Sequence, residues 1–127
     1  LLTHEEAIRA YARMMNTLDA SGLEPLLAED FHYASQWVFE EIESKDEFMV
    51  YIEGKLQAIR QSGQRVWAEM GWLHHSFPGP CAIMSQGHPE NRQALVIAKV
   101  EDGKIRRLDM CCMPPPDSAV GTGEFPR

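Results

Sequence analysis

The stretch Arg92–Pro114, RQALVIAKVEDGKIRRLDMCCMP, decides the fold. Its first part, Ala94–Val100, is apolar on both parities, which is typical of a strand covered on both faces. Glu101–Lys104 predicts a tight turn, because Gly103 supplies the positive φ that a short hairpin loop requires. The returning segment, Ile105–Met113, alternates apolar with charged side chains. The stretch therefore predicts a β-hairpin in a sheet that has an apolar layer packed on one face.

The segments before this hairpin predict helices near the N-terminus. Thr3–Glu6 is a capping box, and apolar residues at helical spacing continue the helix to about Asp19. A short second helix is predicted over Leu23–Leu27. A further capping box, Ser44–Glu47, opens a long amphipathic helix that ends before Gly63.

Alternating apolar residues also predict strands outside the hairpin, at Phe31–Ser35, Trp37–Ile42, Arg65–His75 and Cys81–Gly87. Because helices come first and antiparallel strands come last, the fold class is α+β. We expect a cone-shaped, strongly curved, mostly antiparallel sheet wrapped around the long helix, with two N-terminal helices. Such a cone would leave a cavity between sheet and helix. Residues 1–113 are expected to form a single domain, and residues 114–127 a Pro- and Gly-containing C-terminal tail, disordered or draped on the surface.

Charge and cysteine content exclude several classes of partner. The net charge of −7 opposes a sequence-independent grip on nucleic acid or on an anionic membrane. No apolar run approaches the roughly 20 residues of a membrane-spanning helix. The three cysteines are odd in number and two are adjacent, which is not the framework of a secreted disulfide protein. We therefore expect a cytoplasmic protein with no nucleic-acid or membrane partner.

Two short segments carry a resemblance to a known superfamily. Leu18–Glu24, followed by Leu27–Phe31, resembles the turn between the first two helices and the entry to the first strand of nuclear transport factor 2-like proteins. Glu101–Ile105 is similar to the last hairpin of these proteins, which are also called SnoaL-like or cystatin-like cones. The resemblance covers about Thr3–Met113. It implies a dimer-forming domain with a ligand pocket inside the cone. Related cones serve as ketosteroid isomerases, polyketide cyclases, epoxide hydrolases, dehydratases or non-catalytic modules, so the fold leaves the function open.

The catalytic pattern of a ketosteroid isomerase-like site is missing. That site needs a carboxylate base, a tyrosine and a protonated carboxylic acid around the cavity. The resemblance implies the acid on the strand that carries Val96, the base near Ser35 and the tyrosine near Met15. None of these three positions holds the required side chain.

The weak catalytic candidates are Asp109, His32 and Tyr33. On the last strand the resemblance implies that Leu108 and Met110 face the cavity, while Asp109 faces outward. With the opposite parity, Asp109 would be the best general base in the chain, and a neighbouring Arg107 would lower its pKa.

Metal and cofactor sites are not expected. His74, His75 and His88 could converge at one end of the sheet, but no HxH or HExxH spacing is present. The sequence also has no Gly-rich phosphate loop and no Gly-x-Ser-x-Gly elbow. We therefore predict surface histidines, no metal and no cofactor.

An ample supply of soft and aromatic side chains supports a ligand-binding cone. Seven methionines and three tryptophans suit an adaptable apolar cavity with few polar anchors. The leading hypothesis is binding of a small apolar or aromatic molecule. Two alternatives stay open. One is an enzyme of ketosteroid isomerase-like or polyketide cyclase-like type, acting as an isomerase, lyase or hydrolase with a non-standard site. The other is a protein-binding module whose cone is filled. The expected ligand-binding residues are Tyr11, Met15, Tyr33, Trp37, Met84, Gln86, Val96, Leu108 and Met110.

The outer face of the hairpin predicts a homodimer. Leu95 and Ile97 lie opposite the Val96 face, and nothing else in the sequence is expected to cover them. Because soluble monomers rarely expose a large apolar patch, a second copy is expected to cover this convex sheet face. Arg107 and Asp109 would then lie at or near the interface.

Overall fold

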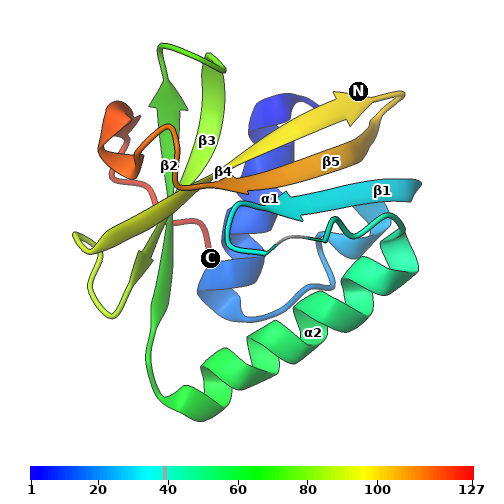
Figure 1. Cartoon of the computed structure of the whole chain (residues 1–127), viewed down its shortest axis with the longest axis horizontal. Coiled ribbons are helices and arrows are strands. Elements are labelled where there is room, and N and C mark those ends of the chain that lie inside the picture. Colours follow the sequence, from blue (N-terminus) through cyan, green and yellow to red (C-terminus); the bar gives the residue numbers. More distant parts are fainter. Residues whose placement is uncertain (39) are drawn as a thin grey trace.

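The computed structural model describes residues 1–38 and 40–127. Within those residues the protein is α+β, with two α-helices, two 3-10 turns and one curved sheet of six strands in the order β1-β5-β4-β3-β2-β6 (Figure 1). The bounds are α1 His4–Thr17, η1 Glu24–Leu26, β1 Leu27–Ser35, α2 Lys45–Ser62, β2 Val66–Leu73, β3 Gly79–Gln86, β4 Arg92–Glu101, β5 Lys104–Cys111, η2 Pro116–Ser118 and β6 Ala119–Gly121.

The hairpin that decides the fold is present with the predicted turn. β4 and β5 pair antiparallel from Glu101 opposite Lys104 to Leu95 opposite Cys111. Asp102 and Gly103 between them have φ values of 53° and 73°. Two consecutive left-handed residues match the right-handed twist of the flanking strands, which explains why this Asp-Gly pair closes the loop.

The first strand differs from the prediction. Leu27–Ser35 is one continuous strand and starts before the predicted Phe31. It pairs parallel with β5, while the other described strand pairs are antiparallel, so the sheet is mostly antiparallel as predicted. The predicted strand Trp37–Ile42 is wrong: in its described part only Ile42 pairs, in a single bridge to Tyr33. Phe39 in that segment lies outside the described residues.

The short second helix is also corrected. Instead of a helix over Leu23–Leu27, the chain makes one 3-10 turn at Glu24–Leu26, with Pro25 in its first turn. Leu27 is already extended and begins β1. Helix α1 ends at Thr17 because Leu18 adopts a left-handed conformation with φ of 58°.

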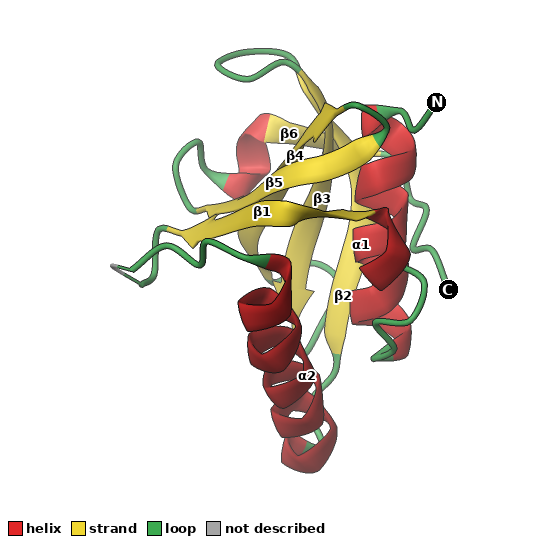
Figure 2. Ribbon diagram, turned by 90° about the vertical axis from the view of Figure 1, so that its right-hand side faces the viewer, coloured by secondary structure: helices red, strands yellow, loops and turns green. Residues whose placement is uncertain are grey.

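The helix under the sheet is α1, not the long α2. Helix α1 lies against β2, β3 and β4, whereas α2 contacts β1 near the edge and extends away from the sheet (Figure 2). This corrects the prediction that the sheet wraps around the long helix. The reason lies in the buried faces: α1 buries seven residues, many of them small or unbranched, while α2 buries only Phe48, Ile52 and Leu56. No helix in the described residues is long and apolar enough to span a membrane.

One buried amide joins α1 to the sheet and to the C-terminus. Asn16 donates from Nδ2 to the carbonyl oxygens of Ala68, at 2.8 Å, and Pro126, at 2.7 Å. Its Oδ1 accepts from the Ala68 N–H at 2.8 Å. The side chain thus satisfies backbone groups that have no strand partner at that point of β2, as buried polar groups require.

The C-terminal segment is part of the fold, which corrects the prediction of a disordered or loosely draped tail. β6 pairs with β2, placing Gly121 opposite Gly71. Ala119 packs into a second apolar cluster on the convex side of the sheet, with Leu73, Cys81, Ile83 and Leu95. Beyond β6, the Gly123 N–H donates to the buried carboxylate of Glu69 at 2.8 Å. A Cβ on Gly121 would lie 2.3 Å from Glu69 Oε2, so any larger residue there would have to displace the Glu69 carboxylate.

The C-terminal segment covers Leu95, which the dimer prediction assumed to be left uncovered within one chain. Leu95 is fully buried by its own chain, and Ile97 is half-buried. Other apolar side chains remain exposed, Trp72 at 47% and Phe77 at 61%. Together with Ile97, Arg107 and Asp109 they line a hollow of about 590 Å³.

The homodimer through this side of the sheet stays a prediction. Sedimentation at micromolar concentration is expected to give twice the 14.4 kDa mass of one chain. Ile97→Glu combined with Phe77→Glu is expected to give monomers, because an interface does not bury unpaired charges of the same sign without a large cost. A wild-type monomer, or a dimer that survives both substitutions, would contradict the prediction. Leu95 cannot serve in this test, because a charge at that buried site would unfold the chain.

Candidate functional site

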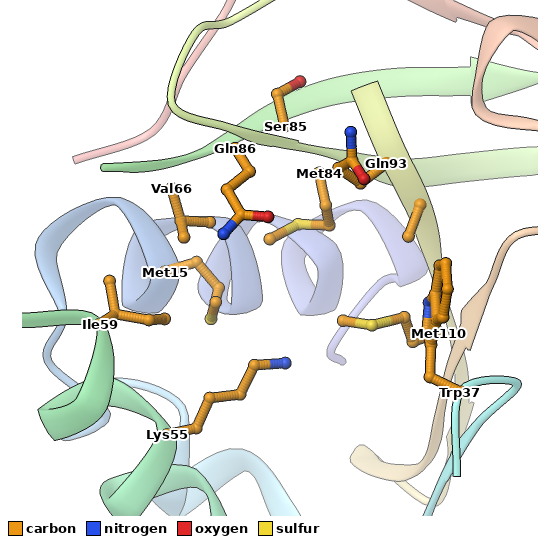
Figure 3. Close-up of a pocket in the computed structure, with 11 residues that line it drawn as sticks. Met15, Trp37, Lys55, Ile59, Val66, Met84, Ser85, Gln86, Gln93 and Met110 are labelled. Carbon is orange, nitrogen blue, oxygen red and sulfur yellow. The ribbon is translucent and has the colours of Figure 1, made fainter. Parts of the chain in front are cut away.

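A cavity of about 360 Å³ lies between the C-terminal halves of both helices and the sheet (Figure 3). Helices α1 and α2 contribute Met15, Lys55 and Ile59. The strands and the segment after β1 contribute the other lining residues, which are Trp37, Val66, Met84, Ser85, Gln86, Gln93, Ala94 and Met110. The volume lies in the range of small-molecule sites, and the wall is mainly apolar, as such sites are.

The structure places some of the predicted ligand-binding residues on the cavity wall and others in the core. Met15, Trp37, Met84, Gln86 and Met110 line the cavity. The remaining four are buried in the main apolar core and do not line it; these are Tyr11, Tyr33, Val96 and Leu108. Ligand contact by these nine residues stays a prediction.

Aromatic packing explains why the cone is filled at the Tyr33 end. The Phe48 ring lies 4.8 Å from Phe31 and 5.3 Å from Tyr33, measured between ring centroids. The Tyr33 ring lies 5.5 Å from Tyr51 in the same way. Burial raises the pKa of Tyr33 and of Tyr11, since desolvation disfavours the phenolate. These phenols therefore stay neutral, and the aromatic cluster fills this part of the interior.

The polar side chains on the cavity wall formed by β3 and β4 already have hydrogen-bond partners. Ser85 Oγ donates to the Pro89 carbonyl oxygen at 2.9 Å. The amide nitrogens of Gln86 and Gln93 donate to the side-chain oxygens of Gln64 and Asn91. Each glutamine keeps an acceptor oxygen that is not used in these bonds.

Lys55 is a site residue that the sequence analysis missed. Its side chain extends from α2 into the cavity toward Met15 and Met110 (Figure 3). The lysine is half-buried, and burial lowers its pKa because desolvation disfavours the ammonium form. The signal in the sequence was its position one turn from Ile52 and from Ile59, on the apolar stripe of the helix.

The weak catalytic candidates do not meet in this cavity. Asp109 pairs with Arg107, whose Nε lies 2.9 Å from Asp109 Oδ2, and Arg107 also pairs with Glu41. His32 Nδ1 lies 3.0 Å from the same Glu41 carboxylate. The hydrogen bonds from His32 and then Arg107 lower the pKa of Glu41. None of these four side chains lines the cavity, and the structure places Leu108 and Met110 inward as the resemblance implied.

The three histidines that the sequence analysis weighed against a metal site, His74, His75 and His88, are separated by the length of a strand. His74 and His75 follow β2, while His88 follows β3, so hairpin connections place them at opposite ends of the sheet. His88 Nδ1 instead accepts from the Glu90 N–H at 3.1 Å. Across residues 1–38 and 40–127, no three His, Cys, Asp or Glu side chains form a group that could hold a metal.

Comparison of the sequence with protein-family models and with curated proteins gives no match. Solved structures do match. A cystatin-fold protein of Novosphingobium aromaticivorans, itself uncharacterised, superposes with a TM-score of 0.61 and 11% identity, over 87% of this chain and 99% of that one. A provisionally assigned polyketide cyclase of Pseudomonas putida gives 0.60 and 19%, over 87% and 92%. An NTF2-like protein of unknown function from Cytophaga hutchinsonii gives 0.57 and 16%, over 90% and 95%.

These similarities show the fold. The chain has the nuclear transport factor 2-like, or cystatin-like, fold that the two short segments implied. At such low identity the matched proteins say nothing about the residues of this cavity, whose chemistry has to be argued from the side chains themselves.

Proposed function

We propose that this protein binds a small apolar or aromatic molecule in the cavity between α1, α2 and the sheet. The observation that carries the proposal is an apolar-walled cavity of about 360 Å³ with very few polar groups left to pair. Three of its wall residues are Met15, Met84 and Met110. Unbranched thioether side chains adapt their shape to an aromatic or branched body at low cost.

Trp37 supports the same function at the edge of the cavity. Its side chain is 62% exposed, yet it also lies against the cavity beside Met110 (Figure 3). An indole in this position offers a flat apolar surface on which an aromatic ligand can stack. A ligand there would cover part of an apolar side chain that is otherwise left in water.

An enzyme of ketosteroid isomerase-like or polyketide cyclase-like type is less well supported. The reason to consider this class is the structural similarity to the P. putida protein, which is provisionally assigned as a polyketide cyclase. A general base must lie within hydrogen-bond reach of the proton that it removes. No carboxylate or histidine is among the lining residues in the described chain, and Asp109 is paired with Arg107 elsewhere. A protein-binding module with a filled cone is disfavoured by the cavity itself.

A neutral aromatic probe tests the proposed function. Calorimetric titration with naphthamide is expected to give a dissociation constant of about 1 mM or tighter. Ala94→Leu, which adds atoms on the cavity wall, is expected to weaken that binding about tenfold. Ala58→Leu on the exposed side of α2 is the matched control and is expected to change nothing. Equal binding by all three proteins would refute the site.

We also expect the binding to take place in the cytoplasm. Cys81, Cys111 and Cys112 are all free thiols in the structure. An odd number of unpaired cysteines is typical of proteins kept in a reducing compartment.

A further inference from the structure

The charges in the cavity are unbalanced. Lys55 is the one cationic side chain among the lining residues of the described chain, and no Asp or Glu accompanies it. Within the described residues, its Nζ makes no hydrogen bond, and no carboxylate lies within 4.0 Å of it. The Tyr51 ring, with its centroid 6.0 Å from Nζ, is a weak substitute for an anion.

An ammonium group in such surroundings is incompletely solvated. Lys55 is half-buried, and the cavity wall around it consists mainly of methionine, isoleucine, valine and alanine side chains. A partly desolvated charge gains most from a hydrogen-bonded counter-ion, because charge-assisted bonds strengthen when water is excluded. Other lysines of the chain lack this setting: Lys99, for example, is exposed and lies 3.5 Å from Glu101.

We infer that the cavity binds a small monocarboxylic acid with an aromatic or branched aliphatic body, whose carboxylate pairs with Lys55. This inference rests on the proposed function, since it names the class of ligand that the same cavity takes. One cation fits one carboxylate, and among the described residues no second cationic side chain lines the cavity to hold a phosphate or a dicarboxylate. The apolar wall of Met15, Met84 and Met110 then contacts the body of the acid.

The orientation of the acid follows from where the polar groups lie. Lys55 enters from α2, while Gln86 and Gln93 lie on the opposite wall, with their amide nitrogens already bonded. Acceptor oxygens on that wall would oppose a carboxylate. The acid group therefore points toward α2, and its apolar body points toward the sheet.

The test compares two probes of nearly equal shape, naphthoate and naphthamide, by calorimetric titration. Wild-type protein is expected to bind naphthoate about tenfold or more tightly than naphthamide, the gain of one partly desolvated charged hydrogen bond. Lys55→Met keeps a long apolar side chain and removes the charge. It is expected to abolish the preference by weakening naphthoate binding, with naphthamide binding unchanged.

Lys99→Met is the matched control, because it removes the same charge from an exposed site outside this cavity. It is expected to leave the binding of both probes unchanged. Since the protein carries a net charge of −7, general attraction of the anion does not imitate the effect. Urea unfolding of each variant checks that it remains folded.

Each outcome separates this inference from the proposed function. If naphthamide binds as tightly as naphthoate, or if Lys55→Met weakens both probes equally, the acid-binding role of Lys55 is refuted while the apolar site stands. If neither probe binds the wild-type protein, both the inference and the proposed function are wrong.

Discussion

Deletion of residues 114–127 is expected to lower the free energy of unfolding by about 4 kcal/mol or more, the largest effect that we predict. The segment covers Leu73, Cys81, Ile83 and Leu95, each exposed by 1% or less in the intact chain. Re-exposing a buried aliphatic side chain costs about 1.5–3 kcal/mol. The deletion also removes the backbone pairing of β6 with β2 and the Gly123 N–H that binds Glu69.

Urea unfolding measures this loss, and the reactivity of Cys81 reports its location. Burial raises the pKa of the Cys81 thiol to about 11, so little thiolate is present near neutral pH. In the truncated chain a maleimide label, located by mass spectrometry, is expected to appear on Cys81. Val120→Ala, at a side chain that is 57% exposed on β6, is the control and is expected to cost less than about 0.5 kcal/mol. An unchanged unfolding midpoint after the deletion would mean that the segment does not pack as described.

Phe48→Ala is expected to cost about 3–5 kcal/mol, the second largest effect. The Phe48 side chain is fully buried, and its ring packs against Phe31, Tyr33 and Tyr51. Removing it would leave a void at the centre of this aromatic cluster. Because α2 buries only three residues, few other contacts can hold this helix in place.

Urea unfolding measures this loss of stability, and substitutions at two other positions of α2 serve for comparison. Glu53→Ala lies on the exposed side of α2 and is expected to change stability by no more than about 0.5 kcal/mol. Ile59→Ala is expected to fall between the two, because Ile59 is half-buried and borders the cavity rather than the packed core. Equal losses for Phe48→Ala and Glu53→Ala would show that the helix presents a different face to β1.

The cavity exists because the two helices contact different strands of the sheet. Helix α1 lies across β2, β3 and β4, whereas α2 contacts β1 and then extends away from the sheet, so neither helix fills the space between their C-terminal halves. Flexible methionines and a lysine border that space instead of a close-packed core. A ligand site in this position therefore needs no movement of either helix, which favours a largely preformed pocket.

Local chemistry let the sequence determine much of the framework by itself. Thr3 and Glu6 do form a reciprocal capping box, because both partners lie within one helical turn. Helix α2 begins after Ser44 and ends before Gly63 for the same kind of reason. The Asp102-Gly103 turn needs only the φ freedom of its own two residues. The order of the elements that these signals mark, together with the resemblance of Leu18–Glu24, Leu27–Phe31 and Glu101–Ile105, indicated the nuclear transport factor 2-like fold.

Only the tertiary structure decided which surfaces meet. A tail rich in proline and glycine carries no periodic pattern, yet Ala119 is buried because Leu73 and Leu95 offer it an apolar surface. The parallel pairing of β1 with β5 and the placing of α1 under the sheet likewise depend on residues far apart in the chain. In the sequence Lys55 is an ordinary charged helix position, and it becomes the unpaired cation of a cavity only when six other segments surround it. Burial and charge pairing are non-local properties, so a pattern read along the chain does not contain them.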